Sequence, residues 1–260
     1  MFGPAAAFPY AEGRAYTPAD APKEMLSALH TRLGIERSVI VQASCHGTDN
    51  RAMLDAIAAD RGRRRGIAIV DELFDEKDYL ALHEGGIRGV RFNFVKHLGG
   101  MPDMDVFHHV LDRIRPLGWH LVVHLDAADI VELSGLLRGL KVPFVIDHMG
   151  RVRADAGLEQ EPFRALLDLM RLDTCWVKVC GSERISTAGP PFHDAIPFAR
   201  ALIGAAPDRV LWGTDWPHPN VGHMPDDGEL VSLVPLMTPD DSVRQKLLVG
   251  NPARLYDFDA

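Results

Sequence analysis

The sequence predicts an α/β protein whose parallel strands form a barrel. Short runs rich in Val and Ile recur along the chain and alternate with segments of helical spacing. These runs barely alternate between apolar and polar residues, which is typical of parallel strands covered on both faces. The length of 260 residues fits one barrel of roughly 250 residues. We therefore expect residues 1–260 to form a single domain.

Seven strand-like runs precede or follow these helical segments. They are Ser38–Ser44, Gly66–Val70, Gly89–Phe94, His120–Asp126, Pro143–His148, Trp176–Gly181 and Val210–Asp215. The leader Met1–Pro22 has no Val or Ile, and a helix over Lys23–Leu33 follows it. A helix before the first visible strand suggests that a further strand should precede that helix. We therefore expect a distorted (β/α)8 barrel from which the first strand is missing.

The missing strand leads to two further expectations. The edges of Ser38–Ser44 and Val210–Asp215 should be exposed, because no strand would lie between them. The leader should be poorly ordered or displaced if nothing anchors it.

The segments between the strands carry apolar residues at helical spacing. This spacing predicts helices around Leu54–Arg61, Phe107–Ile114, Phe163–Met170 and Asp240–Val249. Regular alternation of strand and helix implies right-handed crossovers and a parallel sheet, for which a closed barrel is the most economical form.

Composition and charge argue against several classes of partner. The formal net charge of −8 argues against nucleic acid. No run of about 18 apolar residues would span a membrane, and the start lacks the basic region of a signal peptide. The three cysteines form no disulfide framework and fit a reducing compartment. We therefore expect a cytoplasmic protein; its oligomeric state is left open.

Polar side chains stand at the ends of most predicted strands, which a barrel brings to one face where ligands bind. The most informative run is Val210–Asn220, in which Asp215 ends the strand and is shielded by Trp216 and Pro217. A carboxylate in this place suits a general base or a metal ligand, although an Asp can also cap the following turn. The other candidates are Ser44, His46, Arg91, Asn93, His124, His148, Arg151, Arg184 and His218.

Each of these candidates also has a structural explanation. His124 and His148 could be core histidines, and Arg91 could form a salt bridge, since an unpaired buried arginine is costly. Arg184 could lie in a solvated loop. Cys180 is better explained as a small core residue than as a nucleophile. These separate explanations do not account for the presence of so many polar groups at strand ends.

The motifs, taken in chain order, resemble those of the amidohydrolase superfamily. More narrowly, they are similar to the lactonase branch that contains the 2-pyrone-4,6-dicarboxylate hydrolases. The matching segments are Phe2–Ala5, Phe8–Tyr10, Tyr16–Pro18, Val41–Asn50, Gly89–Phe94, Asp147–Arg151, Leu211–Asn220 and Asn251–Tyr256. The resemblance implies a distorted (β/α)8 barrel that hydrolyses a ring ester.

The resemblance also implies a role for each matching residue. Asp215 would deprotonate the attacking water, and family histidines, including the one that matches His148, would polarise the lactone carbonyl. His124, at the end of its strand, is a further catalytic candidate. Arginines would hold the substrate carboxylates. The substrate-binding candidates are Arg91, Arg151, Arg184, Ser44, Tyr16, Asn93, His46, His97 and His218. The implied partner is a small carboxylated lactone, and no cofactor is expected, although other members of the superfamily bind Zn²⁺ or Mn²⁺.

Two departures from the family pattern leave alternatives open. Family members carry a His-x-His strand directly before the Phe-Gly-Pro leader, whereas Met1 stands there in this chain. His97, next to Lys96, occupies the position of a second basic residue, which favours a lactone related to the pyrone dicarboxylate. The alternatives are a metal-dependent decarboxylase that uses His124, His148 and Asp215, and a truncated barrel that binds a small acid without turnover.

Overall fold

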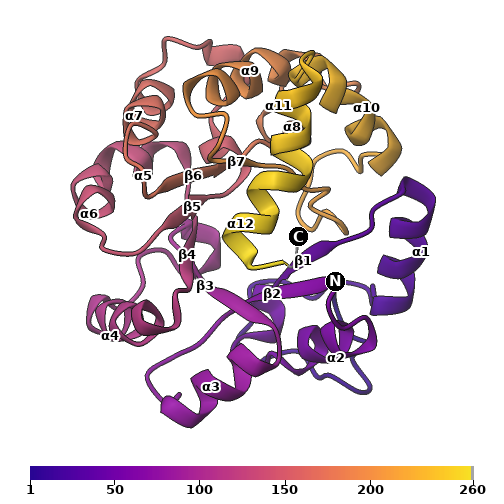
Figure 1. Cartoon of the computed structure of the whole chain (residues 1–260), viewed down its shortest axis with the longest axis vertical. Coiled ribbons are helices and arrows are strands. Elements are labelled where there is room, and N and C mark those ends of the chain that lie inside the picture. Colours follow the sequence, from indigo (N-terminus) through magenta and orange to yellow (C-terminus); the bar gives the residue numbers. More distant parts are fainter. Residues whose placement is uncertain (259–260) are drawn as a thin grey trace. The chain divides into compact units, whose positions relative to one another are not determined.

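Seven strands alternate with helices in a computed structural model that describes residues 1–258 (Figure 1). The strands follow one another in the sheet in chain order, from β1 to β7. Parallel pairing joins β1 to β2 and β2 to β3. It likewise joins β5 to β6 and β6 to β7. The predicted α/β class and parallel strand order are therefore confirmed, and the order is that of a TIM-type barrel.

The described chain divides into two compact units, Met1–Val122 with Phe258, and Val123–Asp257. The single domain remains a prediction. No helix among residues 1–258 has the length and apolar content that a bilayer crossing requires.

The first unit carries the strands β1 to β3. Its elements are α1 (Lys23–Leu33), β1 (Ser38–Val41), η1 (Ser44–His46), α2 (Arg51–Ala59), β2 (Arg64–Ala68), α3 (Glu76–Glu84), β3 (Ile87–Asn93), η2 (Lys96–Leu98), α4 (Met104–Ile114), η3 (Arg115–Leu117) and the start of β4 (His120–His124). The helix α1 has the predicted bounds and ends at Gly34, whose φ of 71° suits a residue without a side chain. In α4 the predicted apolar residues Phe107, Val110 and Ile114 are fully buried.

The leader is anchored, so the condition under which it was expected to be poorly ordered or displaced is not met. Phe2 and Ala21 exchange backbone hydrogen bonds of 2.9 and 3.0 Å. The N–H of Gly3 donates to Nε2 of His46 at 3.0 Å, and that of Ala11 donates to the carbonyl of Cys45 at 2.8 Å. These contacts give hydrogen-bond partners to backbone groups of the leader. A local sequence pattern cannot predict the partners, because His46 and Cys45 are distant from the leader in the chain.

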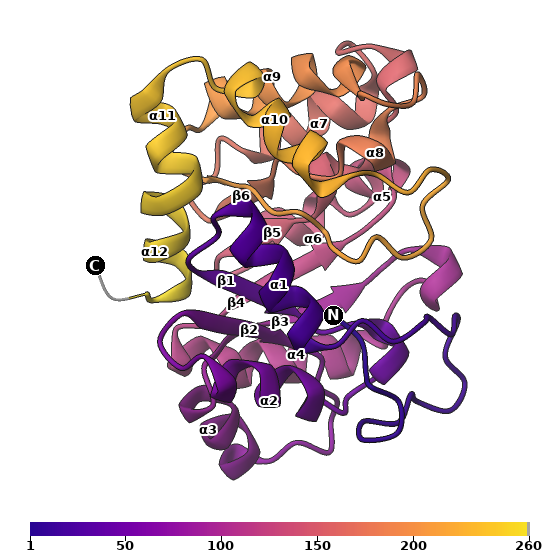
Figure 2. The same ribbon diagram turned by 90° about the vertical axis from the view of Figure 1, so that its right-hand side faces the viewer.

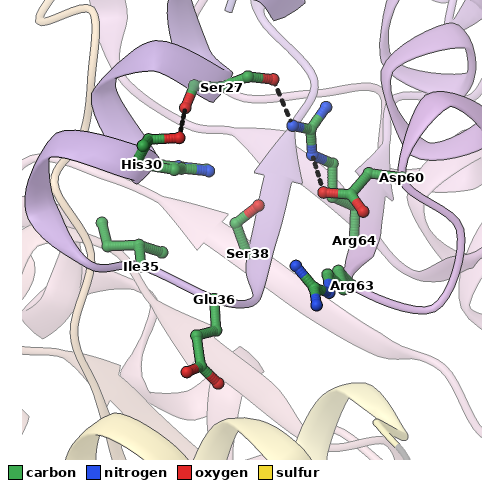
Figure 3. A pocket seen from close by; sticks show the side chains of 9 residues that line it. Ser27, His30, Ile35, Glu36, Ser38, Asp60, Arg63 and Arg64 are labelled. Atoms are coloured by element: carbon green, nitrogen blue, oxygen red, sulfur yellow. Dashed lines mark hydrogen bonds and ion pairs between the residues drawn. The ribbon is translucent and has the colours of Figure 1, made fainter.

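Arg64 ties the first two helices of this unit to β2 (Figure 3). It is 4% exposed, and its guanidinium donates to Ser27 Oγ at 2.7 Å and to the carbonyl of Ala56 at 3.0 Å. Its Nε also lies 3.7 Å from a carboxylate oxygen of Asp60. Arg64 is therefore a structural connection between α1, α2 and β2.

The second unit carries β5 to β7. Its elements are the end of β4, α5 (Ala127–Glu132), α6 (Ser134–Gly139), β5 (Phe144–Ile146), η4 (His148–Arg151), η5 (Ala154–Ala156), α7 (Glu161–Leu169), β6 (Cys175–Lys178), α8 (Ser182–Ile185), η6 (His193–Ala195), α9 (Ile196–Ala205), β7 (Val210–Leu211), α10 (Asp227–Met237), α11 (Asp241–Gln245), η7 (Lys246–Gly250) and α12 (Asn251–Tyr256). Figure 2 shows α11 and α12 as a nearly continuous column, drawn in yellow.

The column from α11 to α12 supplies an edge contact to β7 that the sequence analysis did not foresee. The carbonyls of Arg209 and Leu211 accept hydrogen bonds from β6, so the carbonyl of Val210 points to the other edge. There Asn251, 2% exposed, donates its amide to Val210 at 2.9 Å. The expected open edge at Val210–Asp215 is therefore covered at this carbonyl.

Candidate active site

His148 and Asp215 lie just beyond their strands and not on them. Strands β5 and β7 end at Ile146 and Leu211, earlier than predicted. The four residues His148–Arg151 have φ values of 50°, 51°, 67° and 51°, and Asp215 has 64°. A left-handed conformation costs a non-glycine residue roughly 1–2 kcal/mol, and such strain gathers at functional sites. The turns therefore direct the side chains of His148 and Asp215 away from the strand direction.

Asp215 is the centre of the polar cluster in the second unit. Its Oδ2 accepts a hydrogen bond from Arg184 Nε at 2.5 Å, and its Oδ1 lies 3.8 Å from His148 Nε2. The side chain keeps 19% of its exposure, so a small molecule can reach the carboxylate. Burial by itself would raise the pKa of Asp215, but the positive charges of His148, where it is protonated, and of Arg184 outweigh it and lower the pKa below the usual value. Asp215 is therefore an ionised carboxylate at neutral pH.

His148 faces Asp215 as a neutral imidazole. It is 6% exposed, and burial lowers its pKa more than Asp215 and Asp147 raise it. Its Nδ1 lies 3.6 Å from Sγ of Cys180. Burial raises the pKa of Cys180 well above the usual value, so the group stays a thiol and can donate to Nδ1. The imidazole proton is then on Nε2, on the side of Asp215.

Gly181 fixes the position of this imidazole. Its φ is 74°, and a Cβ added there would stand 3.0 Å from Cβ and 3.1 Å from Nδ1 of His148. A side chain at this position would strain the backbone and press on the ring, which would have to shift by a few tenths of an ångström.

Arg184 and His218 belong to a buried chain of charges. Arg184 Nη2 donates to the carbonyl of Pro219 at 3.2 Å, and its Nε lies 3.9 Å from Glu183 Oε1. His218 is 2% exposed; its Nδ1 lies 3.5 Å from Glu183 Oε1 and its Nε2 lies 3.0 Å from Asp227 Oδ1. Both ring nitrogens of His218 thus face carboxylates.

The second unit also carries the predicted residues His124 and Arg151. The ring of His124 stands 5.5 Å from that of His148 at an interplanar angle of 80°. Arg151 donates from Nε to Asp126 Oδ1 at 3.0 Å, and both side chains are partly exposed. Arg151 therefore already holds an internal carboxylate, with which a substrate carboxylate would compete.

The first unit carries the other predicted residues. Asn93, at the end of β3, donates its amide to Ser44 Oγ at 3.2 Å. Burial raises the pKa of Tyr16, and the charge of Arg91 opposes that shift. His46 is 2% exposed and binds the leader with both ring nitrogens, Nε2 to Gly3 and Nδ1 to the carbonyl of Pro9 at 3.3 Å. The side chain of His97 lies outside the described part.

Three acidic side chains near the cluster were not singled out as site residues by the sequence analysis: Glu183, Asp227 and Asp147. Asp147 is 2% exposed, and its carboxylate lies 2.7 Å from Lys178 Nζ. Burial opposes the charge of Lys178, but Asp147 outweighs it and raises the Lys178 pKa to about 12. Glu183 directly precedes Arg184, which is the one sequence signal for it. Asp227 follows the helix cap Asp226, and no local pattern distinguishes the two.

One group of side chains among residues 1–258 could offer three atoms to a metal ion: Glu183, Asp215 and His218, whose ligand atoms lie within 4.8 Å of one another. The guanidinium of Arg184 contacts both carboxylates of this group. Burial disfavours the charged His218, but Asp227 and Glu183 outweigh it and raise its pKa to about 9. A protonated imidazole has no lone pair for a metal. A divalent cation at this group would therefore compete with the guanidinium of Arg184 and with the proton of His218.

Comparison with known proteins identifies the family to which this chain belongs. The amidohydrolase family profile matches residues 1–258, so the chain belongs to the amidohydrolase family. The resemblance inferred from the sequence motifs is thus confirmed.

Individual relatives narrow this class. A 2-pyrone-4,6-dicarboxylate hydrolase of Comamonas testosteroni is 46% identical over 98% of this chain and 87% of its own length. A 4-sulfomuconolactone hydrolase of Rhizobium radiobacter is 44% identical over the same shares. A crystal structure from Acinetobacter baumannii, described as a probable 2-pyrone-4,6-dicarboxylic acid hydrolase with citric acid bound, has a TM-score of 0.85 and 26% identity and covers 96% of this chain and 94% of that one.

Proposed function

We propose that this protein is a hydrolase that opens a carboxylate-bearing lactone with a water activated by Asp215. The observation that carries the proposal is the partly exposed, ionised Asp215 between the guanidinium of Arg184 and the neutral imidazole of His148. A base, a neutral proton donor and a cation within this distance are the groups that acyl transfer to water requires.

The proposed reaction has two steps. Asp215 takes a proton from water while the oxygen of that water attacks the lactone carbonyl, and Nε2–H of His148 donates to the carbonyl oxygen as it becomes negative. The ring C–O bond then breaks, and the leaving oxygen takes the proton from Asp215. The products are a new carboxylic acid, which releases its proton to solvent at neutral pH, and a hydroxyl or enol in one open chain, and Asp215 is regenerated as a carboxylate.

The expected substrate carries at least one further acid group. Two curated relatives act on a pyrone dicarboxylate and on a sulfonated lactone, as their names state. In this chain the guanidinium of Arg184 lies against Asp215, that of Arg151 is partly exposed beside Asp126, and guanidinium groups bind carboxylates in bidentate fashion. Arg91, Ser44, Asn93 and Tyr16 stay predicted contacts of the substrate.

We propose further that the reaction uses no metal cofactor, because the cluster around Asp215 holds a guanidinium where a cation would bind. This disfavours the alternative of a metal-dependent decarboxylase. A cytoplasmic location is also proposed, since all three cysteines are unpaired and buried, as a reducing compartment allows.

The test is a panel of lactones with the purified chain. The panel pairs 2-pyrones and muconolactones that carry one or two carboxylates, or a sulfonate, with neutral analogues of the same ring. Ring opening is followed by the loss of pyrone absorbance or by proton release. We expect kcat/KM for the acidic members to exceed that of the neutral ones by about 10²-fold or more, as a site built around charged partners allows. Equal kcat/KM for neutral and acidic members would refute the proposed substrate class.

A further inference from the structure

Glu183 is a buried carboxylate to which the proposed reaction assigns no role. Its side chain is 0% exposed, and neither oxygen has a hydrogen-bond partner. An ionised carboxylate without hydrogen bonds is costly to bury unless cations compensate it. The compensating groups are Arg184 Nε at 3.9 Å and His218 Nδ1 at 3.5 Å.

His218 connects Glu183 to a second buried carboxylate. Its Nε2 stands 3.0 Å from Asp227 at the start of α10, and Asp227 is 7% exposed. The side chains therefore alternate in charge along one path: Asp227, His218, Glu183, Arg184 and Asp215. Each cation has a carboxylate on either side, which is the arrangement that lets five charges share a site of low dielectric constant.

The path ends at the group that acts as base in the proposed function. Arg184 bonds Asp215 through Nε at 2.5 Å, and His218 also lowers the pKa of Asp215 through its charge. Without Glu183, the two cations Arg184 and His218 would repel each other with no charge between them. Arg184 would then be held at this position by Asp215 and by the carbonyl of Pro219 alone.

We propose that Glu183 and Asp227, with a protonated His218 between them, form a buried clamp that holds Arg184 against Asp215. Glu183 and Asp227 are thus positioning residues of the hydrolase, which act through Arg184 and do not touch the substrate. The inference rests on the proposed function for its effect on catalysis, but the clamp itself can be observed without turnover.

The clamp depends on the charge of His218, which can be measured directly. Burial of His218 opposes protonation, while Asp227 and Glu183 favour it more strongly. The groups that face the ring are Glu183 from α8, Asp227 from α10 and Asp215 from the turn after β7. Removal of either carboxylate charge should therefore lower the pH at which His218 loses its proton.

The experiment compares Glu183→Gln and Asp227→Asn with the unchanged chain. Histidine labelled with ¹³C reports the pKa of His218 by NMR. We expect it to fall by at least one unit in each variant. We expect kcat/KM to fall about fivefold or more at pH 9, where His218 of the unchanged chain is half protonated, and less at pH 6.5, where His218 regains its proton. Glu229→Gln, an exposed position of the same helix α10, is the matched control and should change neither value.

The outcomes separate the clamp from the proposed function. An unchanged His218 pKa in both variants would overturn the clamp, as would a loss of kcat/KM that is equal at pH 6.5 and pH 9. If Glu183→Gln fails to fold, Asp227→Asn gives the same two readouts. If the unchanged chain opens no lactone while the His218 pKa falls in the variants, the proposed function fails and the clamp stands.

Discussion

The protonation of His218 should make the stability of the protein depend on pH. The folded pKa of about 9 lies above the ordinary value of 6.5. A group whose pKa is raised by folding contributes stability that is fully present below the unfolded pKa and is lost as pH rises through the folded one. The imidazolium should therefore stabilise the fold at pH 6 and contribute almost nothing above pH 9.5.

The size of this contribution follows from the shift of 2.5 units between 6.5 and 9. Each unit corresponds to about 1.4 kcal/mol, so the full effect is about 3 kcal/mol. The side chain of His218 is 1% exposed, and solvent screens the interaction little. Other histidines work in the opposite direction, because burial lowers the pKa of His46 and of His148. The effect must therefore be isolated by a difference.

The assay is urea unfolding of the unchanged chain and of His218→Gln at pH 6 and pH 9.5. The difference in the free energy of unfolding between the two proteins should shrink by about 3 kcal/mol from the lower to the higher pH. Titrations elsewhere cancel, since both proteins share them. A difference that stays constant over this range would mean that His218 is neutral in the folded protein, and the charge alternation described for the site would be refuted.

Three other predictions concern activity and packing. Asp215→Asn should lower kcat on an acidic lactone about 10²- to 10⁴-fold, the usual contribution of a general base. The control is Asp173→Asn, which changes a fully exposed carboxylate. Near-normal turnover of Asp215→Asn would exclude Asp215 as the base. Gly181→Ala should lower kcat several-fold, because the added methyl group displaces His148. It should also reduce the free energy of unfolding by about 1–2 kcal/mol. Unchanged kinetics would show that the His148 ring has room for the methyl group. Asn251→Leu removes the amide that donates to the buried carbonyl of Val210 and to the part-buried carbonyl of Pro207. The change should cost about 2–4 kcal/mol, a fall in Tm of roughly 5–15 °C. A Tm within about two degrees of the unchanged value would contradict this.

Much of the site could be predicted because its signals are local in the sequence. The string around Asp215 and the segment Asp147–Arg151 are contiguous motifs at strand ends, and the structure brings Asp215, His148 and Arg184 within hydrogen-bonding or ion-pair distance. The protonation states could not be predicted in this way. The same carboxyl group can be a base, a clamp or a surface charge, and burial and neighbouring charges decide which. His218 resembles a substrate contact in the sequence, yet both its ring nitrogens face buried carboxylates.

The sequence by itself determined the alternation of strands and helices, since apolar periodicity is set by which faces must be buried. The match at Lys23–Leu33 and the seven strands show this. Only the tertiary structure decided which distant groups meet: His46 with the leader, Asn251 with the edge of β7, and Glu183 with His218. These contacts join residues 35 to 43 positions apart, and they satisfy buried donors, acceptors and charges. A sequence pattern identifies the residues that must be buried, but the folded chain alone fixes which partner each buried polar group finds.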